Sequence, residues 1–400
     1  MAAVDVIVVG GGPGGSATAA FLARSGMRVA LFERATFPRR KPCGDYLNPG
    51  CDAAFARLGV RDAVAASGAR TVHGMHIVAP TGDGVTLSFE HRVGWDLPRR
   101  TLDDLLLAHA SRCGARVFQG VRVVGVARDP RRVLVSVARA PGAAPETYTA
   151  SLAVGADGLR SAVARMAGLG GPPRRGRYTL GAYLEGLAPR TAPDAGVGEV
   201  HLGTDRYCGV AYLPEGLANV TVAVGRDTLR SRGGPIEAWY WASLRTFPEL
   251  ADRLAHARQV GPIAGSGPLG YWRRRCVADR IILVGDAAAY VDPMTGQGVY
   301  LALRGAELAA SAALEALGRA GPIRRGLAGY VRARGELHGV FLISRILQAL
   351  AFRPGLATRV IRRLRAQPEL GAAMIAAIGN VAPPGSVLRP GFIARTLGVV

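Results

Sequence analysis

The hydrophobic pattern near the start of the chain alternates between continuous apolar runs and a segment of small residues. An apolar run at residues 4–9 leads into a glycine-rich turn at residues 10–15. A helical segment at residues 16–25 and a second apolar run at residues 27–32 follow. Continuous apolar runs of this length are typical of strands that are buried on both faces of a parallel sheet. The segment therefore predicts a strand–helix–strand unit with a glycine turn between its first strand and its helix.

Later segments repeat these two patterns and add a third. A buried strand is expected at residues 280–284, and a long helix at residues 298–317. Period-two alternation is typical of an antiparallel sheet and is concentrated in the middle of the chain. It predicts strands at residues 178–185, 198–202, 208–213 and 219–224. Further strands are expected at residues 71–79, 86–89, 116–127, 133–138 and 152–155, and helices at residues 51–58, 101–113 and 235–255.

Composition limits the class of protein. The chain has 400 residues, of which 49% are hydrophobic and 20% charged, so it can bury large cores and is not disordered. The five cysteines show neither CxxC nor metal-ligand spacing, so we expect free thiols in a reducing cytoplasm and no metal site. The first strand begins almost at once and the apolar runs are short, so we expect neither a signal peptide nor a membrane span.

The formal net charge of +21 is unusual, and Lys41 is the only lysine. One explanation is a GC-rich coding sequence that favours arginine. Another is attraction of the basic surface to an anionic substrate or to anionic lipid, with peripheral association at the inner face of the membrane. Nucleic acid is not expected as a partner, because aromatic residues are only 6% and do not interleave with a basic block. The sequence does not indicate an oligomeric state.

Each glycine of the N-terminal turn has a separate role in binding a dinucleotide. Gly10 makes the tight turn, Gly12 lets the backbone approach a pyrophosphate, and Gly15 lets the helix pack closely on the sheet. The helix N-terminus offers free N–H groups and a partial positive charge to the phosphates. Glu33 follows Gly15 by 18 residues and is expected where a carboxylate accepts hydrogen bonds from ribose hydroxyls. These features predict a protein that binds NAD or FAD.

Three further elements can contact a dinucleotide cofactor, and the first two bear on the choice between NAD and FAD. The strand at residues 280–284 ends in a Gly-Asp pair, where Asp286 can accept a hydrogen bond from a ribityl hydroxyl. Residues 292–298, Asp-Pro-Met-Thr-Gly-Gln-Gly, open the long helix, whose N-terminus can stabilise a reduced, negatively charged flavin. The element at residues 154–161 contains a tight turn at Asp157. The alternative for each element is a plain turn that caps a helix.

In this order and spacing, these motifs resemble the FAD-dependent oxidoreductases with the para-hydroxybenzoate hydroxylase fold. Three details are similar to the geranylgeranyl reductase branch of that superfamily. They are Lys-Pro-Cys-Gly at residues 41–44, Trp95-Asp96 ahead of Arg99-x-x-Leu102-Asp103, and Ala218-Asn219-Val220. The resemblance covers essentially the whole chain.

The resemblance implies that FAD is the cofactor and assigns residues to its parts. The glycine turn and Glu33 would hold the ADP half, and the backbone of Val123 would meet the adenine. Arg99 would contact the ribityl or phosphate region, and residues 296–298 would lie against the isoalloxazine ring. The expected cofactor residues are Gly10, Gly12, Pro13, Gly14, Gly15, Glu33, Arg34, Gly44, Arg99, Val123, Asp157, Gly285, Asp286, Pro293, Gly296, Gln297 and Gly298.

The resemblance also implies a fold and its division into domains. We expect an α/β (α+β) protein in which a discontinuous Rossmann-type FAD-binding domain covers residues 1–70, 95–172 and 275–320. An antiparallel β-sheet substrate-binding domain, residues 71–94 and 173–274, is inserted into it. Residues 321–400 would form a C-terminal region that is helical to about residue 380 and ends in a Pro/Gly-rich tail.

Two residues are candidates for catalysis. The turn at residues 41–44 would face the flavin ring, which puts Cys43 at the ring edge and the point charge of Lys41 near it. The alternatives are a small buried cysteine and an ordinary surface lysine.

The resemblance favours reduction of carbon–carbon double bonds in a bulky hydrophobic substrate, such as an isoprenoid or a related lipid. Gly209, Ala211 and Leu213 are expected to line the substrate site, where the small residues imply a wide pocket. NAD(P)H or another reductant would supply electrons. The alternative is hydroxylation of an aromatic or polyketide-like compound, and a quinone is a third class of substrate. A halogenase is disfavoured because the WxWxIP motif is absent, and a flavoprotein without turnover because the FAD motifs are intact.

Overall fold

The computed structural model describes residues 3–171, 176–190, 196–318 and 323–399, and a mainly parallel sheet forms its N-terminal part. The sheet has the strand order β18-β19-β11-β1-β2-β8, and the N-terminal strand–helix–strand unit is confirmed. Strands β9 and β10 extend it as an antiparallel ribbon alongside β11. The bounds are β1 (Ala3–Val9), β2 (Val29–Phe32), β8 (Arg116–Phe118), β9 (Arg122–Arg128), β10 (Val133–Ala138), β11 (Glu146–Gly155), β18 (Val277–Ala278) and β19 (Ile281–Leu283).

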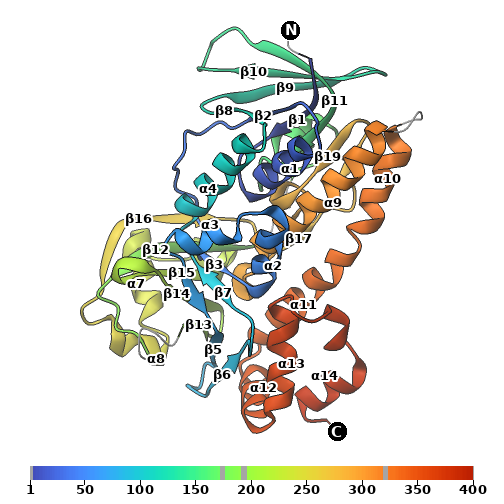
Figure 1. Cartoon of the computed structure of the whole chain (residues 1–400). Helices are drawn as coiled ribbons and strands as arrows, with labels where there is room; N and C mark the ends of the chain where they lie inside the picture. The colour runs from blue at the N-terminus through green and yellow to red at the C-terminus, as the bar shows by residue number, and fades with distance from the viewer. Residues whose placement is uncertain (1–2, 172–175, 191–195, 319–322, 400) are drawn as a thin grey trace.

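Small residues let helices pack closely on this sheet. Helix α1 (Pro13–Arg24) lies between α4 (Arg99–Arg112) and α9 (Gly298–Gly318), and α10 (Ile323–Ala333) packs on α9 (Figure 1). The buried face of α9 is largely alanine, which allows the helix backbones to approach one another. Helices α2 (Pro49–Leu58), α3 (Arg61–Ala66) and α5 (Ala162–Met166) complete this layer.

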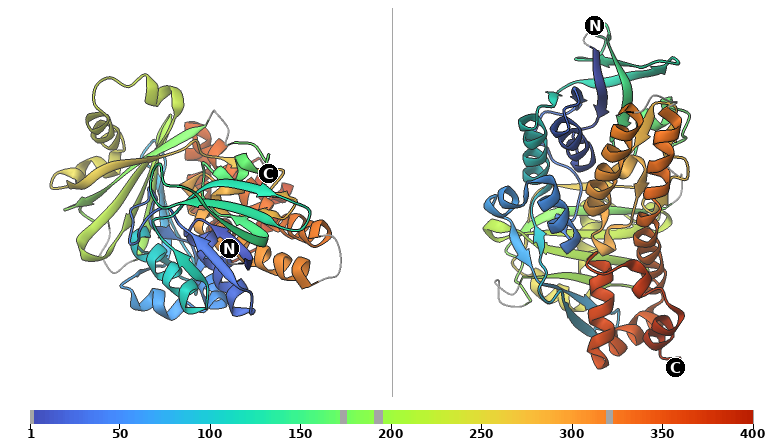
Figure 2. Two further views of the ribbon diagram at one scale, coloured as in Figure 1. Left: turned by 90° about the horizontal axis from the view of Figure 1, so that it is seen from above. Right: turned by 45° about the vertical axis from the view of Figure 1, so that its right-hand side comes forward.

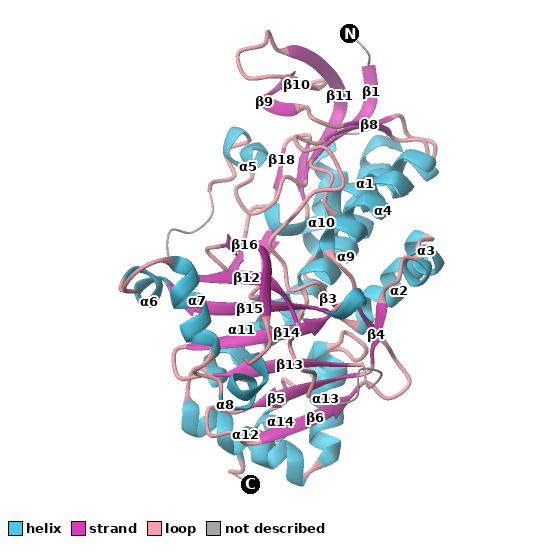
Figure 3. Ribbon diagram, turned by 90° about the vertical axis from the view of Figure 1, so that its left-hand side faces the viewer, coloured by secondary structure: helices cyan, strands magenta, loops and turns pink. Residues whose placement is uncertain are grey.

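A seven-stranded sheet forms the middle of the molecule, in the order β16-β12-β15-β14-β13-β5-β6 (Figure 3). One face packs on α7 (Ile236–Leu244) and α8 (Pro248–Ala251) through an apolar core that includes Val210 and Tyr240. The expected antiparallel pairing is confirmed except between β5 and β13, which run parallel. The bounds are β5 (Gly74–Val78), β6 (Gly84–Ser88), β12 (Arg177–Glu185), β13 (Val197–Leu202), β14 (Arg206–Tyr212), β15 (Leu217–Gly225) and β16 (Arg258–Ser266).

Helices α11 (Glu336–Ala351), α12 (Pro354–Ala366) and α13 (Pro368–Ile378) cover the far part of the other face of this sheet. Together with α9 and α10 they form a column along one side of the molecule, so that the two chain ends lie far apart (Figure 2). No single helix among the described residues is long and apolar enough to cross a bilayer, although the bent pair Gly326–Ala351 and Pro354–Ala366 meets this criterion together.

Five expectations about local structure are wrong in detail. The helix expected at residues 235–255 is divided into α7 and α8, because proline begins a new helix at residue 248. Residues 71–79 form two strands, β4 (Arg70–Val72) and β5, because β4 pairs with β7 (Gly94–Asp96) and β5 pairs in the seven-stranded sheet. The strand expected at residues 116–127 is divided into β8 and β9 by a turn in which Gly120 has a φ of +69°. Helix α4 begins two residues early because Asp45 accepts the N–H of Arg99. The Pro/Gly-rich tail contains helix α14 (Pro390–Leu397), which has proline in its first turn.

The expected division into three domains stays a prediction. The parallel sheet and the seven-stranded sheet each draw their strands from the ranges assigned to them, whereas the small sheets β3-β7-β4 and β17-β20 combine strands from both ranges. Here β3 covers Tyr46–Leu47, β17 covers Tyr271–Trp272 and β20 covers Ala289–Tyr290. Residues 323–399 are mainly helical. The junctions placed at residues 172–173 and 320–321 lie outside the described residues.

Candidate functional site

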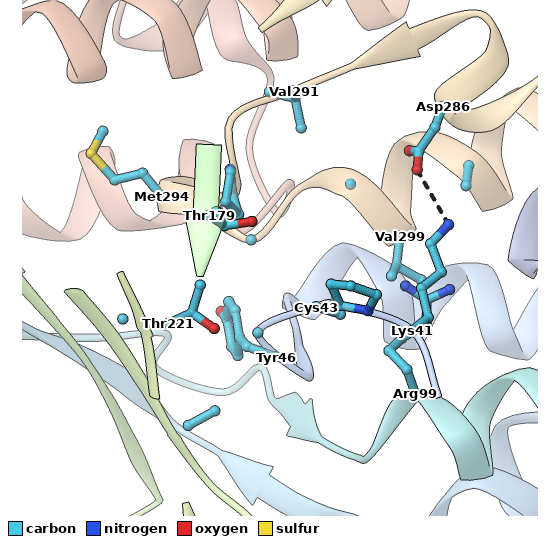
Figure 4. Close-up of a pocket in the computed structure, with 18 of the residues that line it drawn as sticks. Lys41, Cys43, Tyr46, Arg99, Thr179, Thr221, Asp286, Val291, Met294 and Val299 are labelled. Atoms are coloured by element: carbon cyan, nitrogen blue, oxygen red, sulfur yellow. Dashed lines mark hydrogen bonds and ion pairs between the residues drawn. The ribbon is translucent and has the colours of Figure 1, made fainter. Parts of the chain in front are cut away.

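A cavity of about 160 Å³, here called the central cavity, lies where the two sheets and α9 meet. The parallel sheet contributes the glycine turn through Gly12, Pro13 and Gly14. Gly285, Asp286, Pro293, Gly296 and Gly298 come from the two turns that precede α9. Opposite them lies the seven-stranded sheet, from which Thr179 and Thr221 point into the cavity (Figure 4).

A second cavity of about 510 Å³, here called the basic cavity, continues from the central cavity toward β2 and β9. Its wall contains Glu33, Asp157 and the backbone region of Val123. Both cavities are lined by Gly12, Lys41, Pro42, Ala156 and Gly158, so they join end to end. An elongated ligand with an anionic centre therefore fits along them, with its middle at the glycine turn. Of the expected cofactor residues, Gly10, Gly12, Glu33, Arg34, Val123 and Asp157 line the basic cavity.

The glycine turn is close-packed on one side and open on the other. Gly10 has a φ of +103°, and a Cβ there would overlap the backbone of Ala156. A Cβ on Gly15 would overlap the carbonyl oxygen of Gly10, so Gly15 serves helix packing and lines neither cavity. Gly12 faces open space, and a Cβ there would meet only the tip of Arg39 at 3.8 Å. This turn therefore fits a pyrophosphate approached by backbone N–H groups.

Glu33 is fixed by the backbone at the end of β2. Its Oε2 accepts the N–H of Gly11 at 2.7 Å, and its Oε1 accepts the N–H of Ala35 at 2.8 Å. The side chain is 6% exposed and forms part of the wall of the basic cavity. Since each carboxylate oxygen has a further lone pair, Glu33 can also accept hydrogen bonds from ribose hydroxyls.

The ring end of the site is also shaped for a flat group. Gly296 has a φ of +61°, and a Cβ there would overlap the ring of Tyr46. Gly298 begins α9 and has open space around its missing Cβ. No acidic residue occupies the first turn of α9, so the N-terminus of the helix presents an uncompensated positive dipole to the central cavity. These residues fit the isoalloxazine end of FAD.

Asp286 and Lys41 form an ion pair within the central cavity. The Nζ of Lys41 lies 3.5 Å from Oδ2 of Asp286, and both side chains are partly exposed to the cavity. Figure 4 shows this pair across the cavity from Thr221 and Tyr46. The ammonium group of Lys41 therefore lies where the two cavities join, on the cofactor side rather than against the seven-stranded sheet.

Some expected site residues have other contacts or lie elsewhere. Asp157 accepts the N–H groups of Ala162 and Val163 at 2.6 and 3.1 Å and so caps α5 while lining the basic cavity. The side chain of Gln297 is buried and donates to the carbonyl of Ile378 at 3.3 Å, which directs it away from the central cavity. Leu213 follows the end of β14 and does not line the central cavity. It lines a recess at the ends of the strands, here called the side recess.

The loop at residues 41–44 is held against the seven-stranded sheet by polar groups, of which Asn219 belongs to the Ala218-Asn219-Val220 motif and Asp45 was not identified from the sequence. Asp45, at a φ of +58°, follows this loop and accepts hydrogen bonds from Asn219 at 2.7 Å and Tyr183 at 2.8 Å. Asn219 also donates to the carbonyl of Cys43 at 2.7 Å. Burial raises the pKa of Asp45, although these hydrogen bonds oppose the rise. The sequence signal that was available for Asp45 is an acidic residue directly after a glycine, Gly44.

Arg99 lies beneath the same loop and lines the central cavity. Its guanidinium forms two hydrogen bonds with Asp103, at 2.8 and 2.9 Å, and both side chains are buried. Burial lowers the pKa of Arg99, but Asp103 outweighs this and holds that pKa well above its ordinary value. Arg99 is therefore a fixed cation in the wall next to Cys43, which Figure 4 shows between Arg99 and the sheet.

A third, apolar cavity of about 100 Å³ continues from the central cavity, away from the basic one. The two share Tyr46, Met75, Val200 and Met294 in their walls. Beyond these residues the apolar cavity lies between β13 and helices α11, α12 and α13. No charged side chain among the described residues lines it. This extension was not predicted, because the residues that form it are far apart in the sequence.

The comparisons with known proteins agree with this arrangement. The FAD binding domain family matches residues 3–336. A digeranylgeranylglycerophospholipid reductase of Methanothrix thermoacetophila is 32% identical over 78% of this chain and 78% of its own length. A menaquinone reductase of Mycobacterium tuberculosis is 31% identical over 76% and 75%. A 1H-pyrrole-2-carbonyl-(peptidyl-carrier protein) chlorinase of Pseudomonas fluorescens is 26% identical over 78% and 76%. Two of these relatives are named as reductases and one as a chlorinase.

Solved structures share the fold. A flavoprotein/dehydrogenase from Cytophaga hutchinsonii has a TM-score of 0.84 at 20% identity, and covers 99% of this chain and 98% of its own. A geranylgeranyl bacteriochlorophyll reductase-like protein from Thermoplasma acidophilum has a TM-score of 0.80 at 21% identity, with coverage of 100% and 99%. The chain therefore belongs to the FAD binding domain family and is an FAD-dependent oxidoreductase with the para-hydroxybenzoate hydroxylase fold, in the geranylgeranyl reductase-like branch of that superfamily.

Proposed function

We propose that this enzyme reduces carbon–carbon double bonds in a long-chain isoprenoid or a related lipid. The observation that carries the proposal is the junction between the central and apolar cavities at Tyr46, Met75, Val200 and Met294. Through this junction, a flexible chain can place one double bond at the ring end of the site while its remainder lies among apolar side chains.

The apolar cavity has the chemistry of a chain-binding site. Its wall is formed mainly by aliphatic side chains, including Leu347, Ile361 and Met374, and its polar side chains are Tyr46 and Thr295. Burial of each CH₂ group of a substrate in such a site contributes about 0.8 kcal/mol. A planar aromatic compound would gain little from the extension, which supports reduction of a chain over hydroxylation of a ring.

The chain's own residues hold the cofactor and the substrate on opposite sides of the central cavity. FAD, once reduced, supplies a hydride. Glu33, the glycine turn and the N-terminus of α9 would hold the cofactor, while Gly209 and Ala211 leave space on the sheet for a bulky substrate. Lys41 is paired with Asp286 on the cofactor side rather than facing the seven-stranded sheet, and the WxWxIP motif of halogenases is absent, so we do not propose halogenation.

Product analysis tests the proposal. The purified holoenzyme is incubated without oxygen with geranylgeraniol and a reductant, first dithionite and then NADH and NADPH, which we propose as donors. Mass spectrometry should detect a gain of two hydrogen atoms for each bond reduced. Recovery of unchanged geranylgeraniol with every reductant, together with oxygen-dependent hydroxylation of an aromatic compound, would identify the enzyme as a monooxygenase.

We also propose that the enzyme takes its substrate from anionic membranes through its C-terminal helices. Leu342 and Ile393 are 39% and 37% exposed there, and α12 exposes Arg359 and Arg362. A group of helices that exposes both apolar side chains and cations is suited to a surface of anionic lipid. The protein should sediment with phosphatidylglycerol vesicles at low salt, and Arg359→Glu should weaken this binding. Sedimentation that depends on neither lipid charge nor salt would refute the proposal.

A further inference from the structure

Asp96 occupies the wall between the central cavity and the side recess, which reaches the surface. It is the last residue of β7, is 3% exposed, and lines both spaces. The side recess is lined by residues that include Thr71, Glu215 and Gly216, which are exposed to solvent. Asp96 therefore separates the solvent-accessible side recess from the proposed substrate site.

The carboxyl group has an oxygen that the fold leaves without a partner. Among the described residues, no hydrogen bond is made to Oδ1 of Asp96, although this atom is buried. Burial raises the pKa of Asp96 well above its ordinary value, and the carboxyl of Asp45 adds to this. The charge of Arg70 and a hydrogen bond from the backbone of Tyr212 oppose the rise. An isolated buried carboxylate is costly, so the neutral acid is favoured.

The other carboxyl groups in the wall of the central cavity are already paired. Asp286 forms its ion pair with Lys41. Glu199 accepts hydrogen bonds from Tyr212 and Arg253 on the face of the sheet toward α8. Asp96 is thus the carboxyl group of this wall that combines a buried oxygen without a partner with contact to a solvent-accessible recess.

We propose that Asp96 delivers the proton that completes reduction of the double bond, and that water in the side recess then reprotonates it. This inference rests on the proposed function. Saturation of a C=C bond breaks the π bond and forms two C–H bonds. One carbon receives the hydride supplied by reduced FAD, and the other receives the proton of the Asp96 carboxyl. The electron pair of the π bond forms the new bond to that proton, and the Asp96 carboxylate regains a proton from water.

The test compares two oxidants of the reduced holoenzyme in single turnovers. In Asp96→Asn, reoxidation by geranylgeraniol should be slowed about 100-fold or more, the range of general acid catalysis. Reoxidation by ferricyanide, which removes electrons without protonating a substrate, should be unchanged, as should FAD content. Asp96→Glu, which retains an acid, should recover part of the alkene rate. Asp129→Asn, on an exposed turn between β9 and β10, is the matched control.

Each outcome has a distinct meaning. If Asp96 had only a structural role, its substitution would slow reoxidation of the flavin by both geranylgeraniol and ferricyanide, or would lower the FAD content of both variants. Either result would overturn the inference. An alkene rate in Asp96→Asn equal to that of the wild type would also overturn it, with the proposed function intact. A wild-type enzyme that geranylgeraniol does not reoxidise would overturn the proposed function and, with it, this inference.

Discussion

Ala357 lines the apolar cavity from α12 and allows the proposed chain-binding site to be shortened without touching the cofactor. Its side chain is 4% exposed and lies in the core between α12 and the seven-stranded sheet. Ala357→Phe would place a ring in a cavity of about 100 Å³. Because the ring enters existing space, the fold should tolerate it better than overpacking of a filled core, which costs about 1–3 kcal/mol.

The size of the effect follows from the part of the chain that the ring displaces. If the ring excludes one five-carbon isoprene unit, the unit is no longer buried. Its burial contributes about 4 kcal/mol to the binding free energy, at roughly 0.8 kcal/mol per carbon group. A free chain in water already buries some of its own surface, so we expect the loss of binding free energy to be about half of this value. A loss of about 2 kcal/mol corresponds to a rise in Kd of roughly 30-fold for geranylgeraniol.

The assay is titration of the holoenzyme with prenyl alcohols, followed by flavin fluorescence. Geraniol, which has half as many isoprene units, should bind Ala357→Phe and the wild type equally, because we expect its shorter chain not to reach Ala357. Ala328→Phe, on the exposed side of α10, is the matched control for an added ring. If Ala357→Phe lost the same affinity for geraniol as for geranylgeraniol, with an unchanged Tm, this would refute the assignment of the apolar cavity as the chain-binding site.

Three further predictions follow from buried charged groups. Glu33→Ala removes the acceptor of two backbone N–H groups and should raise the Kd of FAD at least tenfold in ultrafiltration assays; full flavin retention would contradict the assignment. Arg99→Ala leaves Asp103 buried without its main partner and should lower the free energy of unfolding by about 3 kcal/mol in urea titrations, whereas a change below about 1 kcal/mol would show that the pair is dispensable. Burial raises the pKa of Glu199, but its basic partners, Arg253 among them, outweigh this and hold that pKa at about 2. The stability from this group is present above about pH 4.5 and lost as the pH falls toward 2, about 3 kcal/mol in all, and Glu199→Gln should remove this part of the acid dependence.

The cofactor site was predictable because its determinants are consecutive in the chain. A strand, a glycine turn and a helix each have a local pattern, and the two joined cavities open where these elements meet. The same holds for the turn that precedes α9, where Gly296 and Gly298 leave space for a flat group. Resemblance to a known family then provided the order in which these local elements meet.

The substrate side was less predictable because it depends on pairing between distant segments. Tyr46 lies beside Asp96 only because β3 (Tyr46–Leu47) pairs with β7, and neither strand has a strong local pattern. The apolar cavity joins Met75, Met294 and Met374, whose spacing in the chain carries no signal. Asp45 and Asp96 were not identified as functional, since their importance comes from burial, which a sequence pattern does not show for a single polar residue.

Anaerobic stopped-flow reoxidation is the most direct test of the account. The holoenzyme is reduced under nitrogen and mixed in one experiment with geranylgeraniol, and in another with dissolved oxygen. We predict that geranylgeraniol reoxidises the flavin in a single turnover with formation of the saturated bond, and that oxygen reacts slowly. A flavin that stays reduced with geranylgeraniol, but reacts rapidly with oxygen and hydroxylates an aromatic compound, would contradict the account.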